Sequence, residues 1–113
     1  MRYISNPHHC PVTRTMSIIG GKWKPIILNC IGEKSIRFGQ LNQYIPAISN
    51  KVLSSELKEL EELSLIERIK YNELPPRVEY RLTKSGKSLI PLLHEIANWG
   101  NTNLAKKLEK VMS

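Results

Sequence analysis

The 113-residue sequence predicts a small, mainly α-helical domain that carries one β-hairpin. Three observations lead to this fold class. A helix with leucines at helical spacing occupies residues 49–63, a proline-containing turn at 46–48 separates it from a preceding helix, and two short basic strands follow within 65–82. Helix, turn, helix and hairpin in this order are typical of a winged helix-turn-helix.

Three segments precede the helix-turn-helix. Residues 1–10 are polar and are expected to form an N-terminal arm. A short helix is expected over 12–19, and Gly20-Gly21 ends it. A second helix is expected over 22–30, with a proline in its first turn, where the missing N–H costs nothing. The apolar residues with the spacing of a buried stripe on this helix are Trp23, Ile26, Ile27 and Cys30.

The helix-turn-helix itself is expected over 38–63. Ser49 suits the N-cap of the second helix, because its hydroxyl can accept a hydrogen bond from a free N–H of the first turn. Leu53, Leu57 and Leu60 fall on one face of this helix and are expected in the core. Glu56, Glu59 and Glu62 lie elsewhere around the helix, and we expect that they can stay in solvent.

The hairpin and the C-terminal segment complete the domain. Residues 65–82 are expected to form the wing, with a stiff tip that contains two adjacent prolines. Residues 83–110 are expected to form C-terminal helices, with a kink or a break at Pro91. This last segment carries more apolar side chains than one face of a lone helix should expose.

Charge is unevenly distributed along the chain. The formal net charge is +7 at pH 7 and the isoelectric point is about 9.6, which points to a polyanion such as nucleic acid or an acidic membrane surface. Segments 1–24 and 68–87 each carry a net charge of +4, whereas 49–67 carries −3. A DNA-reading helix within 49–67 must therefore keep its acids away from the duplex.

Two cysteines are too few for a disulfide framework, and their spacing fits neither a Cys-x-x-Cys pair nor a zinc site. The sequence also lacks the apolar segment of a signal peptide and any run of roughly 18 apolar residues. We therefore expect a cytoplasmic protein with no membrane partner. Neither a catalytic constellation nor a Gly-rich phosphate loop occurs, so we expect no enzyme and no cofactor.

The second helix of the helix-turn-helix presents short polar side chains and two lysines that can lie against base edges and phosphates. The alternative for such a face is plain solvation, but the basic hairpin beside it favours DNA. Arg77 at the wing tip suits a narrow minor groove. Arg68, Lys70 and Arg81 are either phosphate contacts or surface, as are Lys22 and Lys24. The predicted DNA-binding residues are Ser49, Asn50, Lys51, Ser54, Ser55, Lys58, Arg37 and Arg77.

Cys10 lies in a basic neighbourhood, with Arg14 four residues later. Positive charge lowers the pKa of a thiol, as a sensor of oxidants or electrophiles requires, whereas the alternative is an inert thiol. Cys30 lies on an apolar stripe and is expected in the core. His8, His9 and Cys10 are consecutive and make a poor metal cage, so no metal site is expected.

Several blocks of the chain combine into one pattern: Cys10-Pro11-Val12, Ile19-Gly20-Gly21-Lys22-Trp23, Arg37-Phe38, Ile48-Ser49-Asn50-Lys51-Val52-Leu53, Leu57-Lys58-Glu59-Leu60, Pro75-Pro76-Arg77-Val78-Glu79-Tyr80 and Leu82-Thr83-Lys84-Ser85-Gly86. Together they resemble the HxlR-type, MarR-like winged-helix regulators of bacteria, from about Cys10 to Gly100. Departures are mild, because Gln40 and Asn42-Gln43 replace residues that are often charged.

This resemblance implies a homodimeric, DNA-binding transcriptional regulator whose dimer is built from the N- and C-terminal helices. The cysteine at the position of Cys10 senses oxidants, quinones or aldehydes in several members, whereas Cys30 is a poor second partner because we expect it to be buried. The residues that the resemblance assigns to a dimer interface are Leu92, Leu93, Ile96, Trp99 and Leu104.

The function expected from the sequence is sequence-specific binding of a pseudo-palindrome in double-stranded DNA by a homodimer. A small electrophile or oxidant acting at Cys10 is expected as a further partner. The alternative is a winged-helix module that binds proteins and has no sequence preference on DNA. A third possibility, a receptor whose small-molecule pocket forms at the dimer interface, adds to the DNA-binding reading without excluding it.

Overall fold

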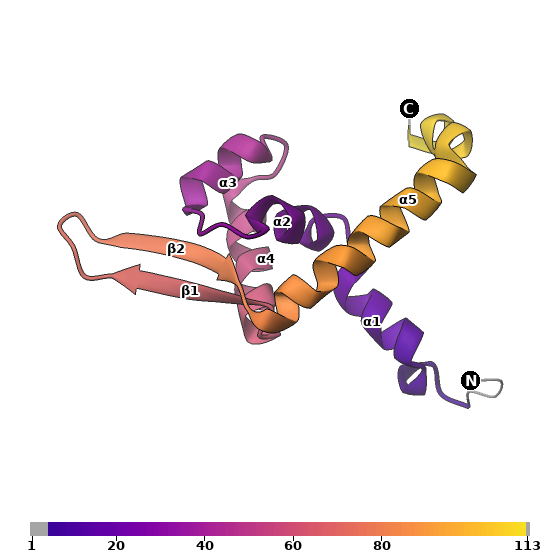
Figure 1. Ribbon diagram of the computed structural model, residues 1–113, viewed down its shortest axis with the longest axis horizontal. Coiled ribbons are helices and arrows are strands. Elements are labelled where there is room, and N and C mark those ends of the chain that lie inside the picture. Colours follow the sequence, from indigo (N-terminus) through magenta and orange to yellow (C-terminus); the bar gives the residue numbers. More distant parts are fainter. Residues whose placement is uncertain (1–4, 113) are drawn as a thin grey trace.

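The helices and the hairpin occur in the expected order (Figure 1). The computed structural model describes residues 5–112, so residues 1–4 of the expected arm lie outside the described part of the chain. The fold is mainly helical with one antiparallel hairpin, as the sequence predicts. Its elements are the 3-10 helix Pro7–His9, α1 Pro11–Ile19, α2 Lys24–Ile31, α3 Phe38–Tyr44, α4 Asn50–Glu62, β1 Ile66–Tyr71, β2 Arg77–Leu82 and α5 Lys84–Met112.

One hydrophobic core joins α2, α3 and α4 to the base of the hairpin. Leu53, Leu57 and Leu60 of α4 are at most 2% exposed, which confirms the expected leucine face. Leu41 of α3 and Ile66 of β1 pack into the same cluster. Because α4 buries its leucine face in this core, the opposite face of the helix is left in solvent.

The buried face of α2 differs from the expected stripe. Ile27 is fully buried, and Trp23 and Cys30 pack against the core from half-buried positions, as expected. Ile26, however, is 41% exposed, so that part of the prediction was wrong. Leu28 and Ile31, which lie outside the predicted stripe, are fully buried. The single-stripe pattern failed because α2 is contacted by α1, α3, β2 and α5 and so has more than one buried side.

Local sequence signals set the ends of the helices. The Ser49 hydroxyl accepts a hydrogen bond from the N–H of Val52 at 3.1 Å, which confirms the expected N-cap of α4. The Thr83 hydroxyl accepts from the N–H of Gly86 at 3.1 Å and caps α5 in the same way. Gly32 ends α2 with φ of +54°, a conformation that glycine adopts without the strain of a Cβ.

The wing is a two-stranded antiparallel sheet in which Ile66 pairs with Leu82 at the base and Tyr71 pairs with Arg77 near the tip. A short bridge extends it, because the N–H of Ile36 donates to the carbonyl of Tyr80 at 2.9 Å and the reverse bond measures 2.8 Å. The segment just before α3 is thus fastened to β2. This contact holds the wing against the helix-turn-helix.

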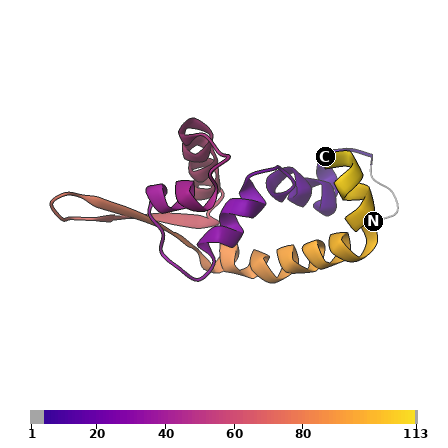
Figure 2. The same cartoon turned by 90° about the horizontal axis from the view of Figure 1, so that it is seen from above.

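The C-terminal segment is one helix, α5, and not the several helices expected. Pro91 lies inside α5 without breaking it, so the expected break was wrong. Pro91 is exposed, and water can satisfy the carbonyl that a proline leaves without a donor. The visible turn of α5 lies instead in its yellow C-terminal part (Figure 2). Both views show α1 and α5 extending from the side of the molecule opposite the wing.

We predict that Gly86→Ala lowers the free energy of unfolding by about 2 kcal/mol or more, because the added Cβ would collide with the backbone carbonyl of Leu65. Gly39→Ala is the matched control, since a Cβ there meets no atom within 4 Å and alanine is the better helix former. Urea unfolding followed by circular dichroism measures both. Equal midpoints for the two variants would contradict the close approach at Gly86.

Candidate nucleic-acid interface

The polar face of α4, defined as Asn50, Lys51, Ser54, Ser55 and Lys58, is exposed along its whole length. The side chains stand on the side of α4 away from the buried leucines, as the sequence predicts. No acidic residue lies in the first turn of α4, so the positive end of the helix dipole is not offset there. An anionic partner is therefore favoured at the N-terminal half of this face.

Two residues that depart from the resembled pattern have local roles. The Gln40 side chain accepts a hydrogen bond from the N–H of Arg37 at 3.0 Å and so closes the first turn of α3. The Asn42 amide donates to the side-chain oxygen of Asn50 at 2.5 Å and ties α3 to the start of α4. This bond orients the Asn50 amide, and the exposed side chain of Arg37 stands at the other end of α3.

Arg77 is held by its neighbours beside the wing tip. Its guanidinium carbon lies 4.0 Å from the centre of the Tyr71 ring. One terminal nitrogen is 3.2 Å from a carboxylate oxygen of Glu73, and Nε is 3.6 Å from a carboxylate oxygen of Glu79. The side chain is 29% exposed, and Nε is buried with no hydrogen-bond partner. Arg77, the first residue of β2, is thus a cation whose orientation is fixed by its neighbours. Its side chain is less exposed to solvent than that of an unpaired residue at the wing tip would be.

A hollow of about 310 Å³ lies between α4 and the wing. Ser54, Lys58 and the acidic Glu61 line it from α4, and Arg68 and the half-buried Tyr80 line it from the two strands. The structure therefore brings Arg68 beside the polar face of α4. Sequence reasoning missed Tyr80, because its place opposite Arg68 depends on the register of the hairpin. Arg81 forms an ion pair with Glu67 across the strands instead.

The glutamates of α4 do not all stay in solvent, which corrects the expectation. Lys24 Nζ lies 2.8 Å from a carboxylate oxygen of Glu56 and also forms an ion pair with Glu59. Burial alone would lower the pKa of Lys24, but hydrogen bonds and charge from the two carboxylates raise it overall. Lys22 lies over the Trp23 ring, 4.8 Å from its centre. Lys24 is therefore engaged within the protein.

Cys10 is the half-buried N-cap residue of α1. The pKa of its thiol lies below the ordinary value, chiefly because the backbone N–H and then the hydroxyl of Thr13 hydrogen-bond to the thiolate. The charge of Arg14, which the sequence suggested as the cause, is the smallest of the lowering contributions. Burial raises the pKa of Cys30, which packs against the core. Among residues 5–112, no three metal-ligating side chains gather at one place.

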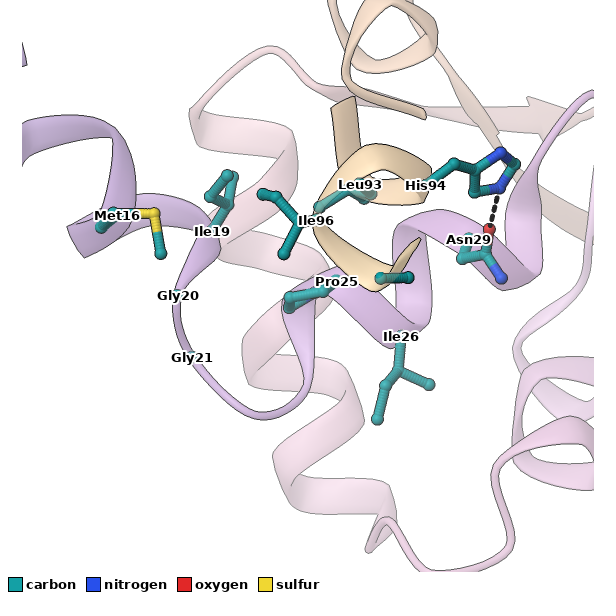
Figure 3. A pocket seen from close by; sticks show the side chains of 11 residues that line it. Met16, Ile19, Gly20, Gly21, Pro25, Ile26, Asn29, Leu93, His94 and Ile96 are labelled. Carbon is teal, nitrogen blue, oxygen red and sulfur yellow. Dashed lines mark hydrogen bonds between the residues drawn. The ribbon is translucent and has the colours of Figure 1, made fainter. Parts of the chain in front are cut away.

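An apolar groove of about 440 Å³ lies between α1, α2 and α5 (Figure 3). Met16 and Ile19 border it from α1, and Leu93 and Ile96 border it from α5. At its edge, an α2 asparagine and an α5 histidine form a hydrogen bond of 3.2 Å. The remaining lining residues are Gly20, Gly21, Pro25, Ile26, Asn29, His94 and Ala97. Two of the helices that border the groove, α1 and α5, extend away from the wing.

The five residues expected at a dimer interface divide into two groups. Leu92, Ile96 and Trp99 are exposed by 44%, 45% and 60%. Leu93 packs partly against the chain's own core, and Leu104 is half-buried.

No helix in the described part of the chain combines the length and hydropathy of a membrane span.

Comparison with known proteins adds to this geometry. The family model for HxlR-like helix-turn-helix proteins matches residues 18–108. An uncharacterized HTH-type transcriptional regulator of Halalkalibacterium halodurans is 44% identical over 101 residues, covering 88% of this chain and 89% of the relative. A MarR-family structure from Porphyromonas gingivalis W83 has a TM-score of 0.82 and 46% identity, covering 91% of this chain and 100% of that one. The oxidised redox regulator HypR has a TM-score of 0.77 and 37% identity, with coverage of 83% and 97%.

We predict that Cys10 is alkylated by iodoacetamide at least about tenfold faster than Cys30 near neutral pH, because a lowered pKa raises the thiolate fraction there. The alkylation rate should rise with pH through the pKa of each thiol, with the lower midpoint for Cys10. Cys30→Ser and Cys10→Ser isolate the two thiols, and Thr13→Ala should move the Cys10 midpoint upward. A Cys10 midpoint above that of Cys30 would contradict the assignment.

Proposed function

The chain belongs to the HxlR-like helix-turn-helix family of transcriptional regulators, and we propose that it acts as a homodimer that binds duplex DNA sequence-specifically. The family consists of regulators and not of enzymes, as the sequence analysis expected. The observation that carries the proposal is the exposed polar face of α4, which faces solvent because the opposite face is buried. The basic wing strand beside it supports the same reading.

In the proposed complex, α4 enters the major groove with its N-terminal half toward the bases. Asn50, Ser54 and Ser55 are short enough to lie against base edges, where a well-formed contact discriminates between bases by about 1–3 kcal/mol. Lys51 and Lys58 reach phosphates or guanine. Arg68 and Arg77 contact the backbone or the minor groove from the wing, with Ser49 and Arg37 at the two helix starts.

The dimer is proposed to form through α1 and α5. Leu92, Ile96 and Trp99 are large exposed apolar side chains on α5, and the apolar groove continues this surface toward α1. Contiguous apolar surface of this kind is typical of an interface. A twofold dimer would place two copies of α4 about one helical turn apart, ~34 Å, on a pseudo-palindromic site.

A sensing role for Cys10 is the remaining part of the proposal. Its thiolate is stabilised at the start of α1, and HypR, which this chain resembles, is named as a redox regulator. Addition of the thiolate to an electrophilic double bond forms an S–C bond and breaks the π bond, and the resulting anion takes up a proton from water. Attack on a peroxide forms an S–O bond and breaks the O–O bond, which yields a sulfenic acid and releases hydroxide or alkoxide. Because Cys30 packs against the core, we do not propose a disulfide between the two cysteines of one chain.

Binding to DNA is tested by fluorescence anisotropy on the duplex upstream of the chain's own gene, against excess nonspecific DNA at near-physiological salt. We predict that Lys51→Ala and Ser54→Ala change the preferred sequence, whereas Arg77→Ala weakens binding similarly on all sequences. A wild-type complex about 10³-fold tighter than nonspecific binding supports the proposal. Weak binding without sequence preference, unchanged by these variants, would favour the protein-interaction module instead.

We predict that Trp99→Ser shifts the protein toward a monomer, because it removes a large apolar ring, 60% exposed on α5, from the proposed interface. Leu74→Ser is the matched control, since Leu74 is 98% exposed at the wing tip, far from α5. Sedimentation velocity over a concentration series measures both variants and the wild type. A wild-type chain that remains monomeric at tens of micromolar, or a Leu74 variant that dissociates equally, would count against this interface.

A further inference from the structure

Helix α4 carries four glutamates and two lysines, and Lys24 of another helix forms ion pairs with two of these glutamates. Lys24 is the first residue of α2 and is 32 residues away in sequence from Glu56, to which it is bonded at 2.8 Å. The same ammonium group also donates to Glu59, one helical turn later on α4. Both carboxylates therefore share a single cation from another helix.

The position of these glutamates on α4 makes the contact specific. At 100° per residue, Glu56 and Glu59 stand between the buried leucine face and the polar face of α4. Their side chains are 21% and 53% exposed, and that of Lys24 is 15% exposed. Lys24 thus binds the side of α4 that lies between its buried and polar faces. A small rotation of α4 about its own axis would break both ion pairs.

Lys24 itself belongs to the first turn of α2, which is fixed in place. The next residue is Pro25, which fixes the backbone of the first turn of α2, and Ile27 anchors the same turn in the core. The Lys24 stem borders a hollow that is also lined by Ser17 and Ile18 of α1. The anchor for α4 is therefore a fixed helix terminus and not a mobile surface chain.

We propose that Lys24 is a positioning residue of the DNA-binding surface, which pairs with Glu56 and Glu59, offsets one of their two negative charges and holds α4 in the rotation that presents its polar face, without itself touching DNA. This inference rests on the proposed DNA-binding function. Unpaired carboxylates on this flank would repel the phosphates that approach the polar face. Loss of Lys24 consequently weakens DNA binding through the two glutamates.

The test is a double-mutant cycle measured by fluorescence anisotropy over a salt series. The probes are a duplex selected from a random-sequence pool with the wild-type chain and a mixed-sequence duplex. Lys24→Met is expected to weaken binding about tenfold in the wild-type background. In the background of Glu56→Gln with Glu59→Gln, the same substitution should change affinity less than about threefold, because nothing is left to neutralise.

The salt dependence separates positioning from direct contact. Lys58→Ala serves as the reference for a phosphate contact and should reduce the slope of log affinity against log salt by about one. In the background of Glu56→Gln with Glu59→Gln, where neither carboxylate is left to repel phosphates, Lys24→Met should leave that slope unchanged. An equal loss of affinity in both backgrounds, or a slope reduced by about one in the glutamine background, overturns the inference and makes Lys24 a DNA contact. Unaltered affinity for Lys24→Met overturns it as well.

Two controls keep the outcome decisive. If Lys24→Met alone does not fold, the test uses the variant with both Glu56→Gln and Glu59→Gln, measured with and without Lys24→Met. A difference in DNA affinity of about tenfold between these two proteins overturns the inference. Lys24→Arg, whose guanidinium can bridge both carboxylates, should retain wild-type affinity. A wild-type chain that binds neither duplex overturns the proposed function and this inference together, whereas wild-type binding with an unaltered Lys24→Met variant overturns the inference alone.

Discussion

The burial of three leucines on one face of α4 is the constraint on which the rest of the structure depends. Leu53, Leu57 and Leu60 are at most 2% exposed, and each fully buried leucine contributes about 1.5–3 kcal/mol. A turn of α4 by one residue, 100°, would expose this face and carry polar side chains such as Ser54 and Lys58 into the core. The outward direction of the polar face therefore follows from packing on the opposite side.

Helix α2 supports α4 in two ways. Ile27, Leu28 and Ile31 give it an apolar wall in the common core, while Lys24 pairs with acids on the flank of α4. The same helix presents Ile26 to the apolar groove on its other side. One short, well-packed helix thus borders both the proposed DNA surface and the proposed dimer surface.

Local signals in the sequence were enough to predict the helix-turn-helix, its Ser49 cap and the wing, because periodicity and capping act over a few residues. The contacts that arrange the candidate site could not be predicted from the sequence. The ion pair of Lys24 with Glu56 spans 32 residues, and the stacking of Arg77 on Tyr71 depends on the hairpin register. Such contacts exist only once the core has fixed the helices and strands relative to one another.

The distribution of acids along α4 limits the way in which a duplex can approach. The first turn has no acid and carries the positive end of the helix dipole beside Lys51, whereas glutamates begin only at Glu56. Glu56 and Glu59 are paired with a cation, but Glu61 and Glu62 remain exposed at the C-terminal end. Phosphates are attracted at one end of α4 and repelled at the other, so the helix favours an approach in which its N-terminal half enters the groove. The net charge of +7 alone does not predict which end of α4 faces the duplex.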